Sequence, residues 1–281
     1  MKKIITIVAV ALVAAAGTIY QVRGPLPSDA PLAVAEIAPA SGVLLPVTWG
    51  DLGPRLVESG ALDAEAFRKL SQARGALPPE VDAILNGSAT QQIKMTPENA
   101  DELLNVLWAV GLANKNPVLE QGPMMDPNYG GADRFASTGG WSLAVGNPMS
   151  HYSMHALMML TPQQQALVEG VSKNIYRPCC GNSTYFPDCN HGMAMLGLLE
   201  MMAAQGASEQ QMYATALAVN SYWFPSQYRT IAQSFANEKR AWDQVDPKLA
   251  LSAEYSSGSG YAAVAARLKP TTSSGGGSCG V

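Results

Sequence analysis

The chain has 281 residues, of which 47% are hydrophobic and only 14% are charged, and its net charge is -4. That length allows one large domain or two smaller ones, either with a substantial core. The sparse charges form no basic stripe, so the sequence gives no electrostatic support for a nucleic-acid partner. The lightly charged, Ala- and Gly-rich composition favours a folded, globular body over a disordered chain.

The first residues have the features of a signal peptide or a membrane anchor, which we place at 1–23. Lys2 and Lys3 precede an apolar run over 4–20, and polarity has returned by Arg23. The run is about as long as the shortest membrane-spanning helix, roughly 17 residues. Two lysines before it and one arginine after it direct the body out of the cytoplasm. We therefore expect an exported protein that this helix anchors in the membrane, or a secreted or periplasmic one where the segment is cleaved.

Composition divides the rest of the chain into three parts. Residues 24–48 are rich in Pro and Ala and predict a linker. Residues 49–268 predict a helical domain, or two subdomains divided near 116–150, where Pro, Gly and Asn are frequent. Residues 269–281 are mostly Gly and Ser and predict a flexible tail.

Helical periodicity and helix-start signals dominate residues 49–268, and alternating runs typical of strands are absent. Capping boxes open helices at Thr161 and Ser208, and the apolar stretch 192–205 indicates a central, buried helix. The other predicted helices are two short ones within 49–70, the second starting at Asp63, then 97–114 behind an N-cap at Thr96, 150–160, 226–239 and 261–268. We therefore expect a compact, mostly α fold.

Three cysteines and a histidine lie within thirteen residues, at Cys179, Cys180, Cys189 and His191, in the pattern CC-x8-C-x-H. Thiolate and imidazole are the ligands of copper, zinc and iron–sulfur centres. Two prolines and a glycine turn the chain there, so that neighbouring ligands can converge. We interpret Asn190 as the N-cap of the buried helix, whose free amide groups stabilise thiolate. The prediction is a site for a soft transition metal, copper or zinc, or for an iron–sulfur cluster, that serves metal handling or electron transfer.

Two other functions are compatible with these cysteines. In a thiol–disulfide oxidoreductase, Cys179 or Cys180 attacks and Cys279, in the Gly/Ser tail, resolves the disulfide. In a non-catalytic structural or interaction domain, the thiols pack as small buried groups. The adjacency of Cys179 and Cys180 counts against a simple tetrahedral zinc site, because neighbouring ligands rarely bind one ion in relaxed geometry. The metal-binding function calls for a metal-donor protein as a partner, and the oxidoreductase function calls for a redox protein.

Part of this segment resembles a known iron–sulfur motif. The pattern Cys180-x-x-Ser183-x-x-x-Pro187-x-Cys189 is similar to the central part of the CDGSH-type motif, in which three cysteines and one histidine hold a two-iron cluster. The similarity covers about a dozen residues. The first cysteine is adjacent rather than one residue away, and the histidine follows the last cysteine more closely, so no ligand is carried over from it.

Two further histidines, His151 and His155, are four residues apart and would share one face of the helix predicted over 150–160. Copper(I) also accepts thioether sulfur, and Met195 repeats the four-residue spacing from His191. We treat His151, His155 and Met195 as weaker metal-ligand candidates, which packing of the two helices would bring to the cysteines. No glutamate lies between the two histidines in the position that a zinc protease requires.

Overall fold

The computed structural model describes residues 36–75 and 77–268. These residues belong to one compact unit and are mostly helical, which confirms the predicted fold class for this part of the chain. The predicted signal or anchor segment at 1–23 and the predicted tail at 269–281, with Cys279, lie outside the described residues. Among the helices described, none combines the length and the apolar character that a membrane crossing needs.

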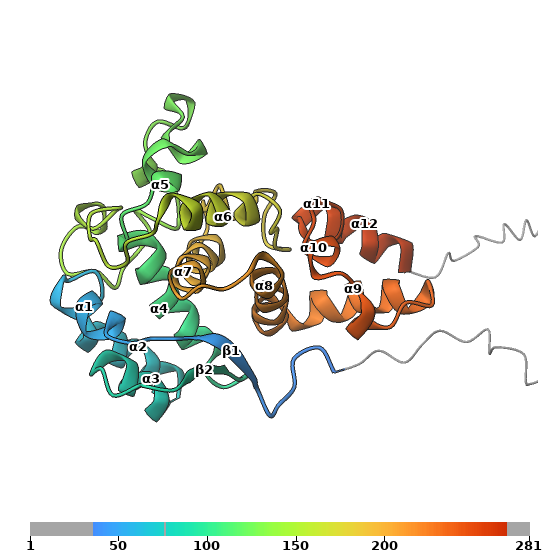
Figure 1. The fold of residues 1–281 in the computed structure, drawn as a ribbon, viewed down its shortest axis with the longest axis horizontal. Helices are drawn as coiled ribbons and strands as arrows, with labels where there is room; N and C mark the ends of the chain where they lie inside the picture. Colours follow the sequence, from blue (N-terminus) through green and yellow to red (C-terminus); the bar gives the residue numbers. More distant parts are fainter. Residues whose placement is uncertain (1–35, 76, 269–281) are drawn as a thin grey trace, which may run out of the picture. The chain divides into compact units, whose positions relative to one another are not determined.

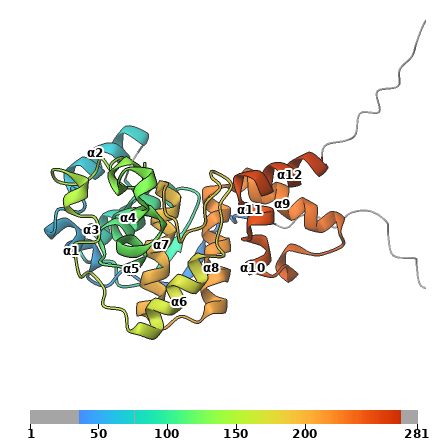
Figure 2. The ribbon, with the colours of Figure 1, turned by 90° about the horizontal axis from the view of Figure 1, so that it is seen from above.

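Twelve α-helices and one two-stranded antiparallel sheet form the described part of the chain (Figures 1 and 2). The strands are β1 (Val43–Thr48) and β2 (Gln92–Met95). The helices are α1 (Leu52–Glu58), α2 (Ala64–Arg74), α3 (Pro79–Leu85), α4 (Ala100–Ala113), α5 (Pro117–Gln121), α6 (Pro162–Ser172), α7 (Asn190–Ala204), α8 (Glu209–Trp223), α9 (Pro225–Asn237), α10 (Pro247–Ala250), α11 (Ala253–Ser256) and α12 (Gly258–Leu268).

The helices gather around a central pair, α4 and α7. Helix α1 packs on α3 and α4, helices α6 and α8 pack on α7, and α9 to α12 pack on one another beside α8 (Figures 1 and 2). Most residues of α4 and α7 are buried. The buried helix predicted over 192–205 is therefore confirmed as α7.

Two glycines allow the backbones of α4 and α7 to touch. A methyl group at Gly111 would lie 2.1 Å from the carbonyl oxygen of Met193, and one at Gly197 would lie 2.4 Å from that of Leu107. Both distances are far inside van der Waals contact, so a side chain at either position would push the helices apart. The contact fixes the position of α7, at whose N-terminal end the cysteine segment arrives.

The expectation that the chain has no strands is wrong. Strand β1 pairs with β2, from Val43 opposite Met95 to Thr48 opposite Gln92. Alternate residues of both strands face the core, so packing against helices stabilises strands that are too short to stand out in the sequence. Strand β1 also lies within 24–48, which we expected to be a linker.

Side-chain caps confirm three of the predicted helix starts. Asp63 accepts hydrogen bonds from two backbone N–H groups at the start of α2. Thr161 and Ser208 form complete capping boxes at the starts of α6 and α8. At these positions the local signal and the tertiary structure agree.

Helix α4 begins at Ala100, four residues after the predicted N-cap Thr96. The buried side chain of Asn99 accepts a hydrogen bond from the N–H of Thr96 (2.8 Å) and donates one to the carbonyl of Lys94 (2.9 Å). These bonds hold the residues before α4 as a turn that joins β2 to the helix.

Residues 151–160 do not form the predicted helix, and only a 3-10 turn, Pro148–Ser150, precedes them. Ser153 has a φ of 54°, in the left-handed region, which interrupts helical winding. The N–H groups of Ser153 and His155 donate to carbonyls at the C-terminal end of α4, which would otherwise lack partners. The segment is therefore irregular and docked on the end of α4.

Candidate metal centre

Cys179 and Cys180 lie within the segment that connects α6 to α7, and Cys189 lies at the end of this segment. The N–H of Tyr176 donates to a carbonyl just after α10 (2.8 Å), and the carbonyl of Cys180 accepts from the N–H of Gly258 (2.7 Å). Cys179 and Cys180 are therefore held beside the C-terminal helices, whereas Cys189 immediately precedes α7.

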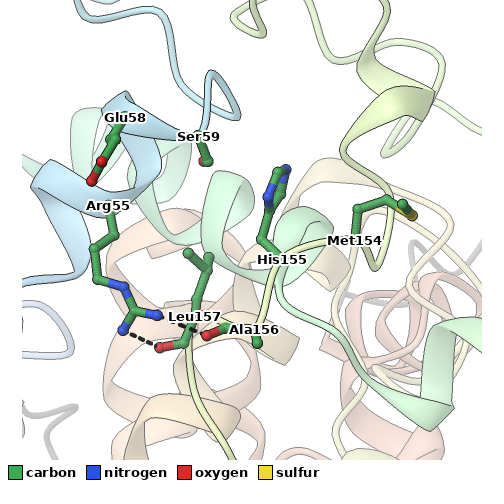
Figure 3. A pocket seen from close by; sticks show the side chains of 7 residues that line it. All are labelled: Arg55, Glu58, Ser59, Met154, His155, Ala156 and Leu157. Carbon is green, nitrogen blue, oxygen red and sulfur yellow. Dashed lines mark hydrogen bonds between the residues drawn. The ribbon is translucent and has the colours of Figure 1, made fainter.

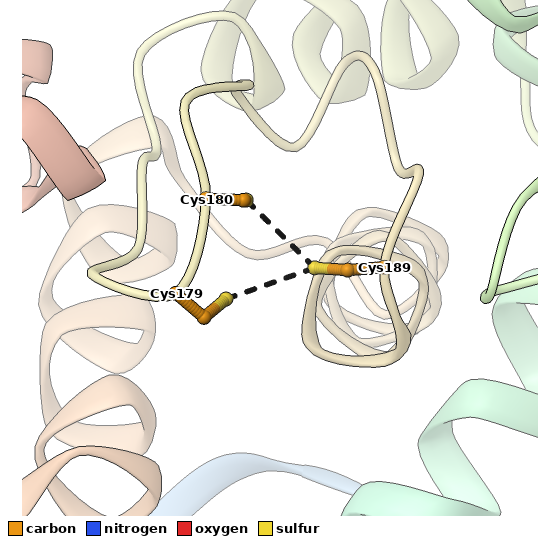
Figure 4. A group of neighbouring side chains, drawn as sticks. All are labelled: Cys179, Cys180 and Cys189. Atoms are coloured by element: carbon orange, nitrogen blue, oxygen red, sulfur yellow. Dashed lines mark hydrogen bonds between the residues drawn. The ribbon is translucent and has the colours of Figure 1, made fainter.

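The sulfur atoms of the three cysteines converge, as Figure 4 shows. The Sγ of Cys179 lies 3.8 Å and that of Cys180 lies 3.9 Å from the Sγ of Cys189. All three sulfurs lie within 4.8 Å of one another. The cysteines are free thiols; Cys179 is exposed and the other two are half-buried.

These separations match those that a shared metal ion imposes. A metal–sulfur distance of about 2.3 Å places two ligand sulfurs about 3.8 Å apart in a tetrahedral site and about 4.0 Å apart in a trigonal one. The distance from Cys189 to Cys179, 3.8 Å, equals the tetrahedral value, and the distance to Cys180, 3.9 Å, lies between the two values. Cys179 and Cys180 therefore both approach Cys189 at distances that suit a shared ion, although their adjacency counted against one in the sequence.

A fully buried arginine, Arg177, supports Cys189. It donates from Nε to the Sγ of Cys189 (3.1 Å), from Nη1 to the carbonyl of Asn182 (3.1 Å) and from Nη2 to the carboxylate of Asp188 (3.2 Å). The side chain of Asn182 also donates to Asp188 (2.8 Å). The guanidinium thus brings a positive charge and a hydrogen bond to the position of a thiolate.

The guanidinium fits because residue 192, in the first turn of α7, is glycine. A methyl group at Gly192 would lie 2.4 Å from Nη2 and 2.6 Å from Cζ of Arg177. A larger residue would displace the guanidinium and, with it, the hydrogen bond to Cys189. Gly192 is therefore part of the site although it offers no side chain.

Negative charge is distributed unevenly over the three sulfurs. Hydrogen bonds from Cys179 and Cys180, together with the charge of Arg177, lower the pKa of Cys189. Hydrogen bonds to Cys180 and Cys189 raise the pKa of Cys179. These contacts favour the thiolate form of Cys189, with the neighbouring thiols as hydrogen-bond donors, and a metal ion would take the place of the thiol protons.

Helix α7 begins at Asn190, and Cys189 occupies the N-cap position that we predicted for Asn190. His191 packs its ring against Phe224 and Trp223, with centroids 4.5 and 5.6 Å apart. It is outside the group of mutually close sulfurs. Burial lowers the pKa of His191 to about 4, and its Nδ1 is buried without a hydrogen-bond partner among the described residues.

The weaker candidates lie elsewhere. His151 and His155 are neighbours even without the predicted helix, with Nδ1 of the former 3.0 Å from Nε2 of the latter. Met195 is fully buried in the core. Within the described residues the cysteine group contains no histidine, so the histidine pair forms a cluster of its own.

Sequence reasoning missed two residues that shape the environment of Cys189, Arg177 and Gly192. It also missed Glu200, a fully buried carboxyl group farther along α7. A signal existed for two of the three. Arg177 is a cation two residues before the cysteines in a chain with few charges, and Glu200 is the single residue of a charged type in the apolar stretch 192–205.

The arrangement provides soft donor atoms, a supporting cation and an exposed edge at Cys179. Such a group can hold a thiophilic ion or exchange disulfides. No known family model, no curated protein and no solved structure matches this chain. The functional argument therefore depends on the geometry of the site.

Proposed function

We propose that Cys179, Cys180 and Cys189 bind one soft metal ion, Cu⁺ or Zn²⁺, in metal handling. The observation that carries this proposal is the convergence of the three sulfurs, at separations that fit one shared ion. Arg177 adds the hydrogen bond to sulfur that tunes thiolate ligands in metal centres.

The number of ligands favours a single ion over an iron–sulfur cluster. A two-iron cluster takes four protein ligands, whereas the group has three thiols. Three thiolates leave a coordination position for water or for a ligand from another protein. Because Cys179 is exposed, a metal-donor protein could reach this edge of the site and exchange the ion.

We also propose that the site acts outside the cytoplasm, on a body that residues 1–23 tether to the membrane or that is released after cleavage. The basic start and apolar run of this segment support export. Protease added to spheroplasts, whose cytoplasmic membrane is intact, should then degrade a tethered body, and a released body should be recovered outside them. Protection of the body until the cytoplasmic membrane is lysed would contradict this proposal.

Metal analysis of the full-length protein, purified without a metal-binding tag, tests the metal site. We expect about one Cu⁺ or Zn²⁺ per chain after loading, and a large loss of bound metal in Cys180→Ser, because a three-ligand site loses a third of its donors. Cys279→Ser is the matched control, since it removes the fourth thiol of the chain and leaves the three proposed ligands in place.

Three results would oppose the metal proposal: no stoichiometric metal, full retention of metal in Cys180→Ser, or an equal loss in Cys279→Ser. The thermal unfolding temperature of the metal-free variants separates loss of a ligand from loss of the fold. His191→Gln shows whether His191, with its unpartnered Nδ1, is a fourth ligand. A loss of affinity in this variant with an unchanged unfolding temperature would identify it as one.

A second function is favoured by one observation, the thiolate character of Cys189 beside the exposed thiol of Cys179. In a thiol–disulfide oxidoreductase, Cys189 would attack the disulfide of a partner protein and release one of its thiolates. Cys179 would then attack the mixed disulfide, leaving a Cys179–Cys189 disulfide and a reduced partner. Mass spectrometry after reaction with an oxidised glutathione buffer would detect this bond. The attack by Cys179 or Cys180 with resolution by Cys279 stays a prediction from the sequence.

A further inference from the structure

A second set of metal-ligating atoms lies beside a pocket of about 370 Å³. The rings of His151 and His155 stack with centroids 5.2 Å apart, and Nδ1 of His151 lies 3.0 Å from Nε2 of His155. Figure 3 shows His155 at this pocket, facing Glu58, the last residue of α1, and Ser59, which follows it. His155 therefore lines a space that water and small ligands can enter, and the buried His151 lies directly behind it.

His151 is oriented as a metal ligand usually is. Its Nε2 lies 3.0 Å from the carbonyl oxygen of Val145. A carbonyl can only accept, so Nε2 carries a hydrogen, and in this tautomer the lone pair of Nδ1 points at His155. A carbonyl that accepts from the N–H on the far side of the ring is the usual support of a metal-bound histidine.

His155 is held equally firmly through its backbone. Its N–H donates to the carbonyl of Ala113 (2.9 Å), and its carbonyl accepts from the N–H of Lys115 (2.8 Å). Arg55 then donates to the carbonyls of Ala156 and Leu157, at 2.7 Å each, as the dashed lines in Figure 3 show. The segment that carries His155 is thus fixed on both sides, which preorganises the pair.

We propose that Nδ1 of His151 and Nε2 of His155 together bind a Cu²⁺ ion, with the remaining positions open to the pocket. At metal–nitrogen distances of about 2.0–2.1 Å, a nitrogen separation of 3.0 Å corresponds to an angle of about 90–100° at the metal. This is the angle between neighbouring ligands in the tetragonal geometry of Cu²⁺. A tetrahedral Zn²⁺ would need the nitrogens slightly farther apart.

Binding requires only a change of tautomer in the free protein. The single hydrogen between the two nitrogens resides on Nε2 of His155, because Nδ1 of His151 accepts it. His155 would move this hydrogen to its Nδ1, and the ion would contact both nitrogens from one side of the line that joins them.

The two sites differ in the metal that they suit. Imidazole nitrogen is a borderline donor that binds Cu²⁺, whereas the three thiols are soft donors for Cu⁺ or Zn²⁺. Met154 does not soften the histidine site, because its side chain is 65% exposed and extends away from the ring of His155 (Figure 3). The histidine site therefore does not depend on the proposed function of the cysteines.

Cu²⁺ added to a full-length variant with all four cysteines changed to serine tests this site without interference from thiols. Electron paramagnetic resonance should report one ion per chain with nitrogen ligands. His155→Gln should weaken binding by at least about tenfold, because even the loss of a residue that only hydrogen-bonds to a metal ligand costs about that much affinity. His191→Gln is the matched control, because His191 is the remaining histidine of the chain and should leave the signal unchanged.

Loss of the nitrogen signal in His155→Gln but not in His191→Gln would support the proposal. Absence of a stoichiometric nitrogen-ligated signal, or an equal loss in both variants, would overturn it. If the cysteine-free chain does not fold, nuclear magnetic resonance of the wild-type chain in its reduced, Zn²⁺-loaded form replaces this measurement. Added Cu²⁺ should then broaden the ring signals of His151 and His155 well before those of His191, and uniform broadening would count against the site.

Discussion

A buried guanidinium is unfavourable unless its N–H groups find partners, and Arg177 meets this requirement inside the cysteine segment. Its Nε, Nη1 and Nη2 bind a sulfur, a carbonyl oxygen and a carboxylate. The neighbouring Gly192 leaves the space that it occupies. A side chain with this position and these partners both orders the turn and stabilises the thiolate of Cys189.

We expect Arg177→Gln to destabilise the fold and to raise the pKa of Cys189. Removing one partner of a buried charge pair costs about 3 kcal/mol or more, which urea unfolding of the metal-free protein would measure. The pH dependence of thiolate absorbance in the native protein would report the pKa. Arg229→Gln, on an exposed face of α9, serves as the control; equal stability of both variants would contradict the role of Arg177.

At the scale of residues, the sequence located the cysteine cluster but not its support. The spacing of Cys179, Cys180 and Cys189 was sufficient to predict that they meet, and the structure brings them together. The place of Arg177 could not be predicted, because its partners follow it in a turn whose path no periodic pattern specifies. The ring of His191 packs on Phe224, whose distance along the chain made that contact invisible in the sequence.

The contact between α4 and α7 shows how two small residues determine the arrangement of long elements. Gly111 and Gly197 face one another, and the N–H and carbonyl groups of each helix approach the other backbone directly. Neither helix could come so close with a side chain at these positions. The packing of the described core around α7 depends on this approach.

Gly197→Ala should therefore destabilise the protein by about 2 to 3 kcal/mol, the cost of overpacking a buried contact. Gly170→Ala is a control within a helix, because a methyl group at Gly170 would meet no atom within 4 Å. Since Ala has the higher helix propensity, this control should be neutral or stabilising by up to about 1 kcal/mol. Chemical denaturation of both variants measures the difference, and a Gly197→Ala variant as stable as wild type would show that the helices separate at no cost.

At the scale of elements, the sequence predicted long amphipathic or buried helices best. Capping signals at Thr161 and Ser208 are local, so they survive whatever packs around them. The sheet of β1 and β2 was missed because its pairing joins residues 44 to 52 positions apart, with three helices between the strands. The helix predicted over 150–160 was wrong because hydrogen bonds to the end of α4 outweigh the local pattern.

At the scale of the whole molecule, Glu200 in α7 is a fully buried carboxyl group that makes stability depend on pH. Its carboxyl group accepts hydrogen bonds from the side chains of Asn114 (3.0 Å) and Asn116. Burial raises the pKa of Glu200 well above its usual range, although these two bonds lower it. The native state therefore keeps a proton that the unfolded chain releases, and stability falls as the pH rises between the two pKa values.

We expect the Glu200→Gln variant to lack this dependence. Below the usual glutamate pKa it should be less stable than wild type by about 1 to 3 kcal/mol, because its amide group faces an asparagine amide donor. The difference should shrink as the pH rises, by up to about 1.4 kcal/mol per pH unit. Urea unfolding across mildly acidic to neutral pH measures it, with Glu254→Gln, at an exposed position, as the control. A constant difference would mean that Glu200 is ionised in the native protein.

The fixed contact of α4 with α7 also decides which part of the metal centre can yield when an ion arrives. Cys189 stands at the start of a helix whose backbone is in direct contact with α4, whereas Cys179 and Cys180 belong to a connecting segment without helical structure. An incoming ion would then meet one firmly held sulfur, whose thiolate form is favoured, and two that close on it. Capture would then proceed from Cys189 outward, and release to another protein would begin at the exposed sulfur of Cys179.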